Sequence, residues 1–205
     1  MSENNSRSMS DIFKKIADEV TGKQRDLFLE ADDIKLKIDR ERRIAELNCT
    51  LPRLYAKRDV YALEDKIRTA YDLSQMRILT HYAPELFSTD YLSEILTEAG
   101  RVGILCNGFF GRYDLETSDH KLIFKIPFTA GGISLLDLAK TARGLEGILY
   151  SEFGLSFVVE IRQREDAEAE AAAYCCHRRR PRAFVYAARF KAIYKIHYRH
   201  CNRCG

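Results

Sequence analysis

The sequence predicts an α+β fold in which helices pack on a mixed or antiparallel sheet, with a short N-terminal helix and an irregular basic C-terminal tail. Two observations lead to this fold class. Short segments alternate apolar and polar residues with the period of two of half-buried strands, whereas longer segments place apolar residues three to four apart, as amphipathic helices do. Pairs of such strands precede a helix more than once, which favours α+β packing over a regular βαβ succession.

The first half of the chain is expected to contain two helices and three strands. In chain order these are a helix over 10–20, strands over 34–38 and 44–51 joined as a hairpin, a helix over 60–71 and a strand over 76–80. Ser10 and Asp11 can cap the first helix, because their side chains accept hydrogen bonds from free amides. Pro52 and Pro84 should end the strands that precede them, since proline lacks the amide that a ladder needs.

The second half is expected to repeat these kinds of element, although no internal repeat is recognisable in the sequence. The predicted elements are a helix from Ser88 or Thr89 toward 105, strands over 112–116 and 121–128, a helix over 134–149 and a strand over 155–161. Gly100 and Gly103 should break or bend the first of these helices. Gly131 and Gly132 are expected to form the turn before the second helix, and Gly154 should end it.

The charge of the chain changes sign near residue 171. Residues 171–205 contain nine basic residues and no acidic one, which leaves 24 basic and 30 acidic residues before them. We therefore expect four parts: a disordered leader over 1–8, an α+β domain over 9–163, a charged helical linker over 164–174, and a basic Cys/His-containing tail over 175–205. The α+β domain divides into two sub-units, if it divides at all, near 84–88.

The distribution of apolar residues argues against a membrane protein and against a secreted one. No apolar run approaches the roughly 18 residues of a membrane span, and the N-terminus lacks the apolar core of a secretory signal. We therefore expect a cytoplasmic protein without membrane contact. Cys49 and Cys106 stand apart without paired spacing, which predicts buried, reduced thiols.

The α+β domain offers weak candidates for chemistry. Asp114 and Glu116 share one face of a strand, and Asp119 and His120 follow in the adjoining turn, so that these groups could hold a divalent ion. The favoured alternative is that both acids point into water while Tyr113 and Leu115 point into the core. The segment 108–111 has the spacing of a GXXG nucleic-acid loop, but its two central phenylalanines favour a turn anchored in the core. We expect no catalytic residue and no cofactor site in this domain.

The tail contains more specific candidates for a functional site than the α+β domain does. A tetrahedral zinc ion could be held by soft ligands of this segment, namely Cys175, Cys176, His200, Cys201 and Cys204. Alternatively, the tail could bind nucleic acid, because arginines interleaved with aromatic residues neutralise phosphates and stack on bases. The foremost arginines are Arg178, Arg179, Arg180 and Arg182. We favour a third interpretation, in which a shift of reading frame produced the abrupt change of composition and the tail has no function.

Four segments of the α+β domain occur in a recognisable order. They are IKLKIDRERRIAELNCTLPRLYAKRDVYALEDKIRTAY, MRILTHYAPELFSTDYLSEIL, HKLIFKIPF and LEGILYSEFGLSFVVEI. This succession resembles the N-terminal region of PolC, the DNA polymerase III replicase of low-GC Gram-positive bacteria, over about residues 9–163. The resemblance implies a role in chromosomal DNA replication. It does not transfer catalysis, because the exonuclease and polymerase residues of that family lie downstream of this region.

The resemblance also implies a way of acting. The front domain of the family is an interaction module, related to the polymerase-binding end of a clamp-loader subunit. We therefore expect non-covalent docking to a replisome protein or to other domains of the polymerase, and little contact with DNA from 9–163, which is net negative. Docking would use a helix face or a sheet edge, and one candidate surface is the solvated helix face formed by Lys57, Arg58, Glu64, Asp65 and Arg68, although such a face is more often merely solvated. The alternatives are a stand-alone nucleic-acid binder that uses the basic tail and a small zinc-binding protein.

Overall fold

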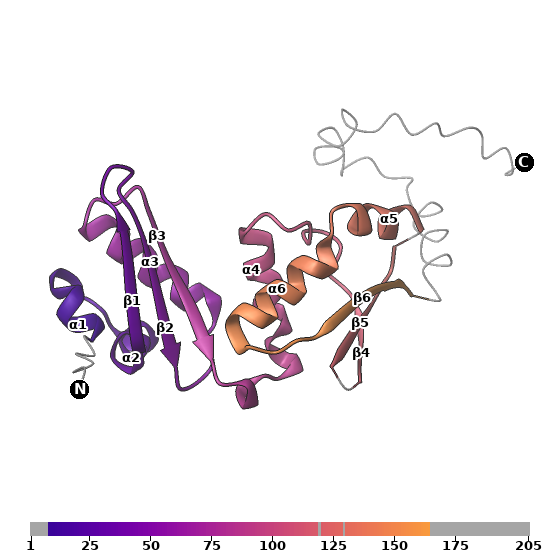
Figure 1. Ribbon diagram of the computed structural model, residues 1–205, viewed down its shortest axis with the longest axis horizontal. Helices are drawn as coiled ribbons and strands as arrows, with labels where there is room; N and C mark the ends of the chain where they lie inside the picture. Colours follow the sequence, from indigo (N-terminus) through magenta and orange to yellow (C-terminus); the bar gives the residue numbers. More distant parts are fainter. Residues whose placement is uncertain (1–7, 119, 129, 165–205) are drawn as a thin grey trace, which may run out of the picture. The chain divides into compact units, whose positions relative to one another are not determined.

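The computed structural model describes residues 8–118, 120–128 and 130–164 (Figure 1). The helices of this part are α1 (Met9–Ile12), α2 (Gly22–Glu30), α3 (Lys57–Ala70), α4 (Leu92–Arg101), α5 (Ala130–Leu138) and α6 (Thr141–Phe153), with short 3-10 turns η1 (Lys14–Ile16), η2 (Pro84–Leu86) and η3 (Thr89–Tyr91). Its strands are β1 (Asp32–Asp39), β2 (Ile44–Leu51), β3 (Gln75–Tyr82), β4 (Asp114–Ser118), β5 (Lys121–Ile126) and β6 (Val158–Gln163). The predicted α+β class is confirmed.

The first sheet has the order β1-β2-β3. Strands β1 and β2 form the predicted antiparallel hairpin, and β3 pairs with β2 in parallel, so that Leu36, Leu47 and Ile78 lie side by side across the sheet. These apolar positions face the helix α3, whose stripe of Val60, Leu63 and Ile67 is buried. A parallel third strand requires a crossover, and α3 supplies it.

The second sheet repeats this arrangement in the order β4-β5-β6. Strands β4 and β5 form an antiparallel hairpin, and β6 pairs with β5 in parallel after a crossover through α5 and α6. Phe124 lies opposite Leu115 and Ile161 in this sheet. The helix α6 contacts both β6 and β3, and therefore packs against strands of both sheets.

The two sheets also share a detail of their hairpins. Arg43 and His120, each directly before the middle strand, have positive φ angles of 54° and 58°. The carbonyl of Arg43 accepts a hydrogen bond from the amide of Gln75, and that of His120 accepts one from Val158. Gln75 and Val158 are the first residues of the third strands. The structure thus contains an internal repetition of backbone arrangement that the sequence did not reveal.

A glutamate of each crossover helix bonds to the outer parallel strand. Glu64 of α3 accepts a hydrogen bond from the amide of Ile78 at 2.6 Å, and Glu146 of α6 accepts one from Val159 at 2.9 Å. Amides on the open side of an outer strand would otherwise lack a partner in the ladder. The two carboxylates therefore cover polar groups of β3 and β6 that would invite pairing with another strand.

An aromatic cluster fills the core where α6 meets β3. Phe153, which is 1% exposed, stacks on Tyr82 with ring centroids 5.3 Å apart. The rings of Tyr91 and Phe87 meet Phe153 edge-on at 5.7 and 5.4 Å. Edge-to-face and offset pairs of this kind add to the free energy of apolar burial. Phe153 is thus a central core residue contributed by the last turn of α6.

Several helices begin or end at other residues than predicted, because tertiary contacts override the local sequence pattern. The helix expected over 10–20 is split, because α1 ends at Ile12 and a 3-10 turn follows Phe13. Its cap is Ser8, which forms a capping box with Asp11, rather than Ser10. The helix α2 was not predicted, since its residues GKQRDLFLE show no clear apolar stripe although Leu27 and Phe28 are buried.

The helix expected over 134–149 is two helices, and this prediction was wrong in its boundaries. Lys140 has φ +55° and separates α5 from α6. The hydroxyl of the next residue, Thr141, is buried and donates to the carbonyl of Leu105 at 3.1 Å. Gly131 and Gly132 do not form a turn but belong to α5. A Cβ on Gly132 would lie 3.0 Å from Phe128 Cβ, so glycine permits this close approach.

Gly154 ends α6 as predicted, with φ +67° and its amide donating to the carbonyl of Tyr150. Replacing Gly154 with alanine is expected to lower the free energy of unfolding by about 1 kcal/mol, because a Cβ is strained in the left-handed region. Gly147, in the middle of α6, has no atom within 4 Å of an added Cβ. Gly147→Ala should therefore raise stability by about 0.5–1 kcal/mol. Urea denaturation compares the two variants, and equal shifts of the same sign would contradict the assignment.

Cys49 and Cys106 are buried free thiols, as predicted. Burial raises the pKa of Cys49 to about 12 and that of Cys106 to about 11. Because the thiolate is the reactive form, both cysteines should resist iodoacetamide at pH 8 in the folded protein and react fully in urea. Peptide-resolved mass spectrometry measures the labelling at each position. Rapid modification of Cys49 without urea would contradict its burial.

Candidate functional site

A buried ion pair joins the start of α3 to the end of α6. The ammonium of Lys57 donates to Glu152 Oε1 at 2.5 Å and to the hydroxyl oxygen of Thr80 at 3.2 Å. Lys57 is 3% exposed, Thr80 2% and Glu152 6%. Charged residues are rarely buried to this extent unless they are paired. This pair is therefore the most unusual polar feature of the described residues.

Neither partner is favoured by the helix in which it stands. Lys57 is the first residue of α3, where the positive end of the helix dipole repels a cation, and Glu152 is in the last turn of α6, where the negative end repels an anion. The carboxylate of Glu94 compensates at α3, because it accepts the backbone amide of Lys57 at 2.7 Å. Tertiary pairing thus overrides local preference at both helix ends.

The structure corrects the predicted docking face on α3. Lys57 and Glu64 are buried, each 3% exposed, whereas Arg58, Asp65 and Arg68 are exposed. The sequence contained a signal for this outcome. Lys57 and Glu64 stand three residues before and four residues after Val60, and so lie on the apolar stripe of the helix. Their charge suggested solvent, but their position indicated the core.

A second network surrounds Glu64. Its Oε2 accepts a hydrogen bond from Arg101, whose guanidinium carbon lies 4.0 Å from the centroid of the Tyr61 ring. The Tyr61 hydroxyl donates to Glu98 at 2.5 Å, and Arg77 donates to the other oxygen of Glu98 at 3.0 Å. Burial raises the pKa of Glu64, while the bonds from Arg101 and the Ile78 amide oppose that rise. These contacts tie α3, α4 and β3 together.

A cavity of about 210 Å³ adjoins the Lys57–Glu152 pair. It is lined by residues of α3, β3, α4, α6 and the turn after α4, namely Lys57, Arg77, Ile78, Leu79, Thr80, Glu98, Val102, Gly144, Gly147, Ile148, Ser151 and Glu152. The second carboxylate oxygen of Glu152, Oε2, is buried and has no hydrogen-bond partner. A buried acceptor in this condition costs free energy until a donor reaches it.

The electrostatics of Glu152 reflect its surroundings. Burial raises the pKa of this carboxyl, Lys57 lowers it, and the carboxylates of Glu98 and Glu94 raise it again. Burial is the largest of these effects. A carboxylate in such a position gains most from a further hydrogen-bond donor or a further cation.

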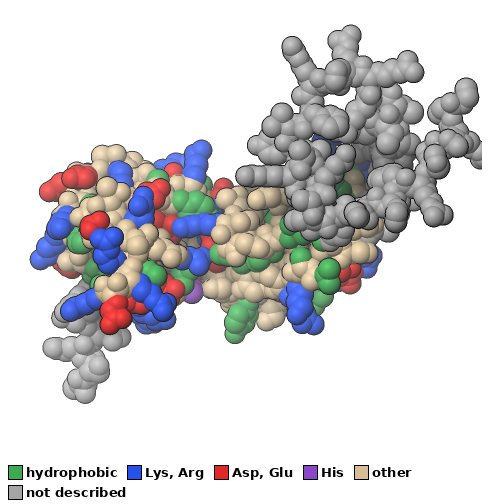
Figure 2. All heavy atoms as spheres, turned by 90° about the horizontal axis from the view of Figure 1, so that it is seen from above, with side chains coloured by type: hydrophobic (Ala, Val, Ile, Leu, Met, Phe, Trp, Pro, Cys, Tyr) green, Lys and Arg blue, Asp and Glu red, His purple; other side chains and the backbone are tan. Residues whose placement is uncertain are grey.

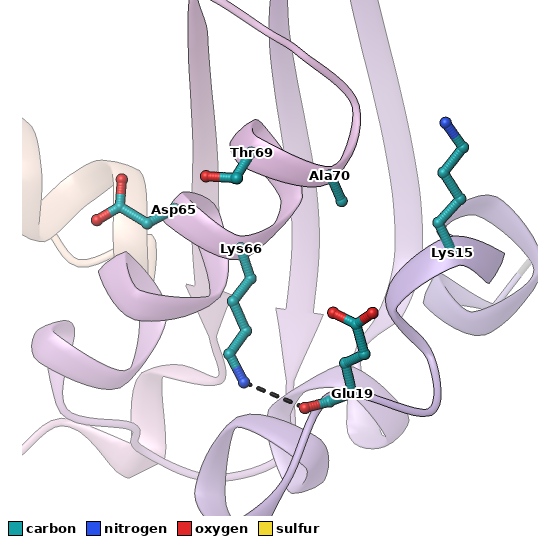
Figure 3. Close-up of a pocket in the computed structure, with 6 residues that line it drawn as sticks. All are labelled: Lys15, Glu19, Asp65, Lys66, Thr69 and Ala70. Atoms are coloured by element: carbon teal, nitrogen blue, oxygen red, sulfur yellow. Dashed lines mark hydrogen bonds between the residues drawn. The ribbon is translucent and has the colours of Figure 1, made fainter.

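A wider groove of about 590 Å³ lies between the N-terminal segment and α3. It is lined by five residues with polar or charged side chains and by one alanine, namely Lys15, Glu19, Asp65, Lys66, Thr69 and Ala70 (Figure 3). Lys66 crosses one end of the groove and donates to the backbone carbonyl of Glu19 at 3.2 Å. The face shown in Figure 2 carries basic and acidic side chains interspersed over the first sheet and its helices, without a patch of one sign.

The acids proposed for a metal site do not converge. Asp114 and Glu116 are exposed on β4, and Glu116 pairs with Lys125 across the hairpin. His120 is exposed, and Asp119 lies outside the described residues. Within residues 8–118, 120–128 and 130–164, no three His, Cys, Asp or Glu side chains are placed to share an ion. The alternation that directs both acids to solvent is confirmed.

The segment 108–111 is a turn anchored in the core, as predicted. Phe110 is buried and meets Phe124 edge-on at 5.3 Å, and Phe109 contacts Phe128 at 4.9 Å. Every tail candidate lies outside the described residues, so those predictions remain predictions. These are Cys175, Cys176, His200, Cys201 and Cys204 for zinc, and Arg178, Arg179, Arg180 and Arg182 for nucleic acid.

No protein-family model matches the chain, and no curated protein sequence is significantly similar to it. In the described part of the chain, no helix combines the length and apolar character needed to cross a bilayer.

Proposed function

We propose that this chain is a non-catalytic interaction module of a PolC-type DNA polymerase III, acting in bacterial chromosome replication in the cytoplasm. The proposal rests on the order of the four segments that resemble the PolC N-terminal region. In the structure these segments form the β1-β2 hairpin with α3, then β3 and α4, then β5, and finally α6 with β6. They therefore supply most of the two sheets and their crossover helices.

The polar side chains of the described residues support docking more than covalent chemistry. The carboxylates of Glu64, Glu98 and Glu146 each bind a backbone amide or a basic side chain of the same fold. Groups held in this way stabilise a scaffold and present a fixed surface. The groove beside α3 and the cavity beside Glu152 are two recesses among the described residues at which a partner could bind.

A binding assay with purified proteins tests the proposal. The full chain is immobilised and offered the clamp loader, the sliding clamp and the C-terminal remainder of a PolC-type polymerase, one at a time. Saturable binding of at least one of them is expected. Intact PolC serves as the positive control, and failure of the chain to retain any protein that intact PolC retains would overturn the proposal.

Deletion of residues 171–205 separates this function from nucleic-acid binding by the tail. The first 170 residues carry 24 basic and 30 acidic side chains, so favourable electrostatics with phosphate must come from the nine basic residues of the tail. Protein docking should survive the deletion, whereas binding to single-stranded DNA, if present, should be lost. Loss of protein docking together with DNA binding would favour the tail as the functional segment.

A further inference from the structure

The side chain of His81 on β3 caps the end of α6. The last four carbonyls of a helix lack partners within it, and Ser151 lies in the last turn of α6. Among the described residues that follow the helix, the amide of Gly154 donates to the carbonyl of Tyr150 and none donates to that of Ser151. His81 Nδ1 lies 2.8 Å from the Ser151 carbonyl oxygen. A side chain of the first sheet thus satisfies this carbonyl, as basic side chains near a helix C-terminus can do.

This contact determines which ring nitrogen of His81 carries a proton. A carbonyl oxygen only accepts, so Nδ1 must donate. The other ring nitrogen, Nε2, lies 3.3 Å from the side-chain oxygen Oδ1 of Asn48 on β2. Neutral imidazole has a single N–H, and when Nδ1 carries it, Nε2 is an acceptor that cannot bond to another acceptor. The arrangement with Asn48 Oδ1 toward Nε2 therefore fits only the charged imidazolium.

The carboxamide of Asn48 can also match the neutral ring. Its oxygen accepts and its NH₂ group donates, and half a turn about the Cβ–Cγ bond exchanges the two. The NH₂ group suits a neutral His81, whose Nε2 accepts, and the oxygen suits the imidazolium, whose Nε2 donates. Each charge state of His81 thus has a matching orientation of Asn48, and Nδ1 donates to Ser151 in both.

The charged side chains around His81 are already paired with one another. The charged or titratable groups on this face of the neighbouring strands, or next to Ser151, are Lys35, Lys37, Asp39, Glu46, Arg77, Tyr150 and Glu152. The charged members pair as Lys35–Asp33, Lys37–Glu46, Arg42–Asp39, Arg77–Glu98 and Lys57–Glu152. In the part of the chain that the structure describes, His81 takes part in no ion pair. Histidine is the side chain whose charge ordinarily changes between pH 5 and 8.

We propose that His81 and Asn48 form a proton-dependent cap that keeps the last turn of α6 attached to β3 in both charge states of the imidazole. Near pH 8, His81 is the neutral Nδ1–H tautomer and its Nε2 accepts from the Asn48 NH₂ group. When Nε2 takes up a proton from water, Asn48 turns its amide and accepts through Oδ1. The bond from Nδ1 to Ser151 is kept throughout. This device belongs to the fold and is independent of any partner that the chain binds.

NMR of the ¹⁵N-labelled full chain tests the proposal, because the shifts of the ring nitrogens distinguish the two neutral tautomers and the imidazolium. At pH 8, His81 should be predominantly the Nδ1–H tautomer, which is the less common one in unconstrained histidine. The NH₂ protons of Asn48 should show contacts to the His81 ring at pH 8 that weaken at pH 5. His120, which is exposed in a turn, is the internal reference. A predominant Nε2–H tautomer of His81 at pH 8, or Asn48 contacts that do not change with pH, would overturn the proposal.

Two variants test the two contacts separately. Asn48→Asp replaces the amide with a carboxylate that only accepts, so only the imidazolium matches it. The protonated fraction of His81 at pH 8 should rise at least threefold, while that of His120 stays the same. His81→Leu removes the cap, and the amide of Gly154, which bonds to the last turn of α6, should exchange with solvent at least threefold faster. An unchanged protonated fraction in the first variant, or an unchanged exchange rate in the second, would contradict the corresponding contact and the proposal with it.

Discussion

Replacing Lys57 with methionine is expected to lower the free energy of unfolding by about 3–5 kcal/mol, the range measured when one partner of a buried ion pair is removed. The variant leaves the Glu152 carboxylate, 6% exposed, without its cation. Urea denaturation at pH 8 measures the loss. Arg58→Met is the matched control, because Arg58 is the next residue of α3 and is exposed. Its effect should stay within about 0.5 kcal/mol.

The loss in Lys57→Met should depend on pH in a definite direction. Burial already raises the pKa of Glu152 above its usual 4.5, and removal of Lys57 takes away the influence that lowers it. An acid with a raised pKa in the folded state favours folding below its unfolded pKa, and this contribution is lost as pH rises through the folded pKa. The stability gap between variant and wild type should therefore be wider at pH 8 than at pH 5. A gap that widens toward low pH would contradict the pairing.

A double variant separates the cost of an orphaned charge from the value of the pair. In Lys57→Met/Glu152→Leu both charges are gone, and the free energy of unfolding should recover most of the loss seen in Lys57→Met alone. If the double variant is as unstable as Lys57→Met, the pair itself holds α6 against α3, and the unpaired carboxylate is not the source of the loss.

Truncation of Phe153 to alanine is the second change expected to have a large effect, about 3–5 kcal/mol of stability. Its ring is 1% exposed and contacts Tyr82, Tyr91 and Phe87, so the variant opens a hole among three aromatic rings. Thermal and urea unfolding, followed by near-UV circular dichroism of the tyrosines, measure the loss.

Tyr150 provides the control for Phe153, because it lies one turn earlier on α6 and is 63% exposed. Tyr150→Ala should change stability by no more than about 0.5 kcal/mol. Phe153→Leu should fall between the two, since it keeps part of the buried volume. Equal effects of Phe153→Ala and Tyr150→Ala would show that the aromatic cluster does not form in solution.

The sequence predicted those parts of the fold in which a local pattern agrees with its tertiary surroundings. The strand predicted over 44–51 has the observed bounds, because its apolar alternation and Pro52 indicate the same boundaries. The helix α2 was missed, since only Leu27 and Phe28 of its nine residues are buried and no periodic stripe results. The break at Lys140 is accompanied by a hydrogen bond from Thr141 to Leu105, a residue 36 positions away that no local pattern could reveal.

The site was harder to predict than the fold, for a physical reason. Burial of Lys57 is possible only because Glu152 faces it, and the two are 95 residues apart. A charge on an apolar stripe can signal either a solvated helix or a buried pair, and the second requires knowledge of the partner. The exposure of Asp114 and Glu116, in contrast, could be predicted from the local sequence. Their alternation with Tyr113 and Leu115 was enough to place both acids in solvent.

The same separation along the chain affects how the protein is made. Residues leave the ribosome at about 5–20 per second, so Glu152 follows Lys57 by roughly 5–20 s. During that interval the first sheet and α3 can form, but the ammonium of Lys57 has no counter-ion and must stay hydrated. The first turn of α3 can therefore pack against its core only after α6 has been synthesised. A chain released before Glu152 is added would therefore retain a hydrated Lys57 and an incompletely packed core around the first turn of α3.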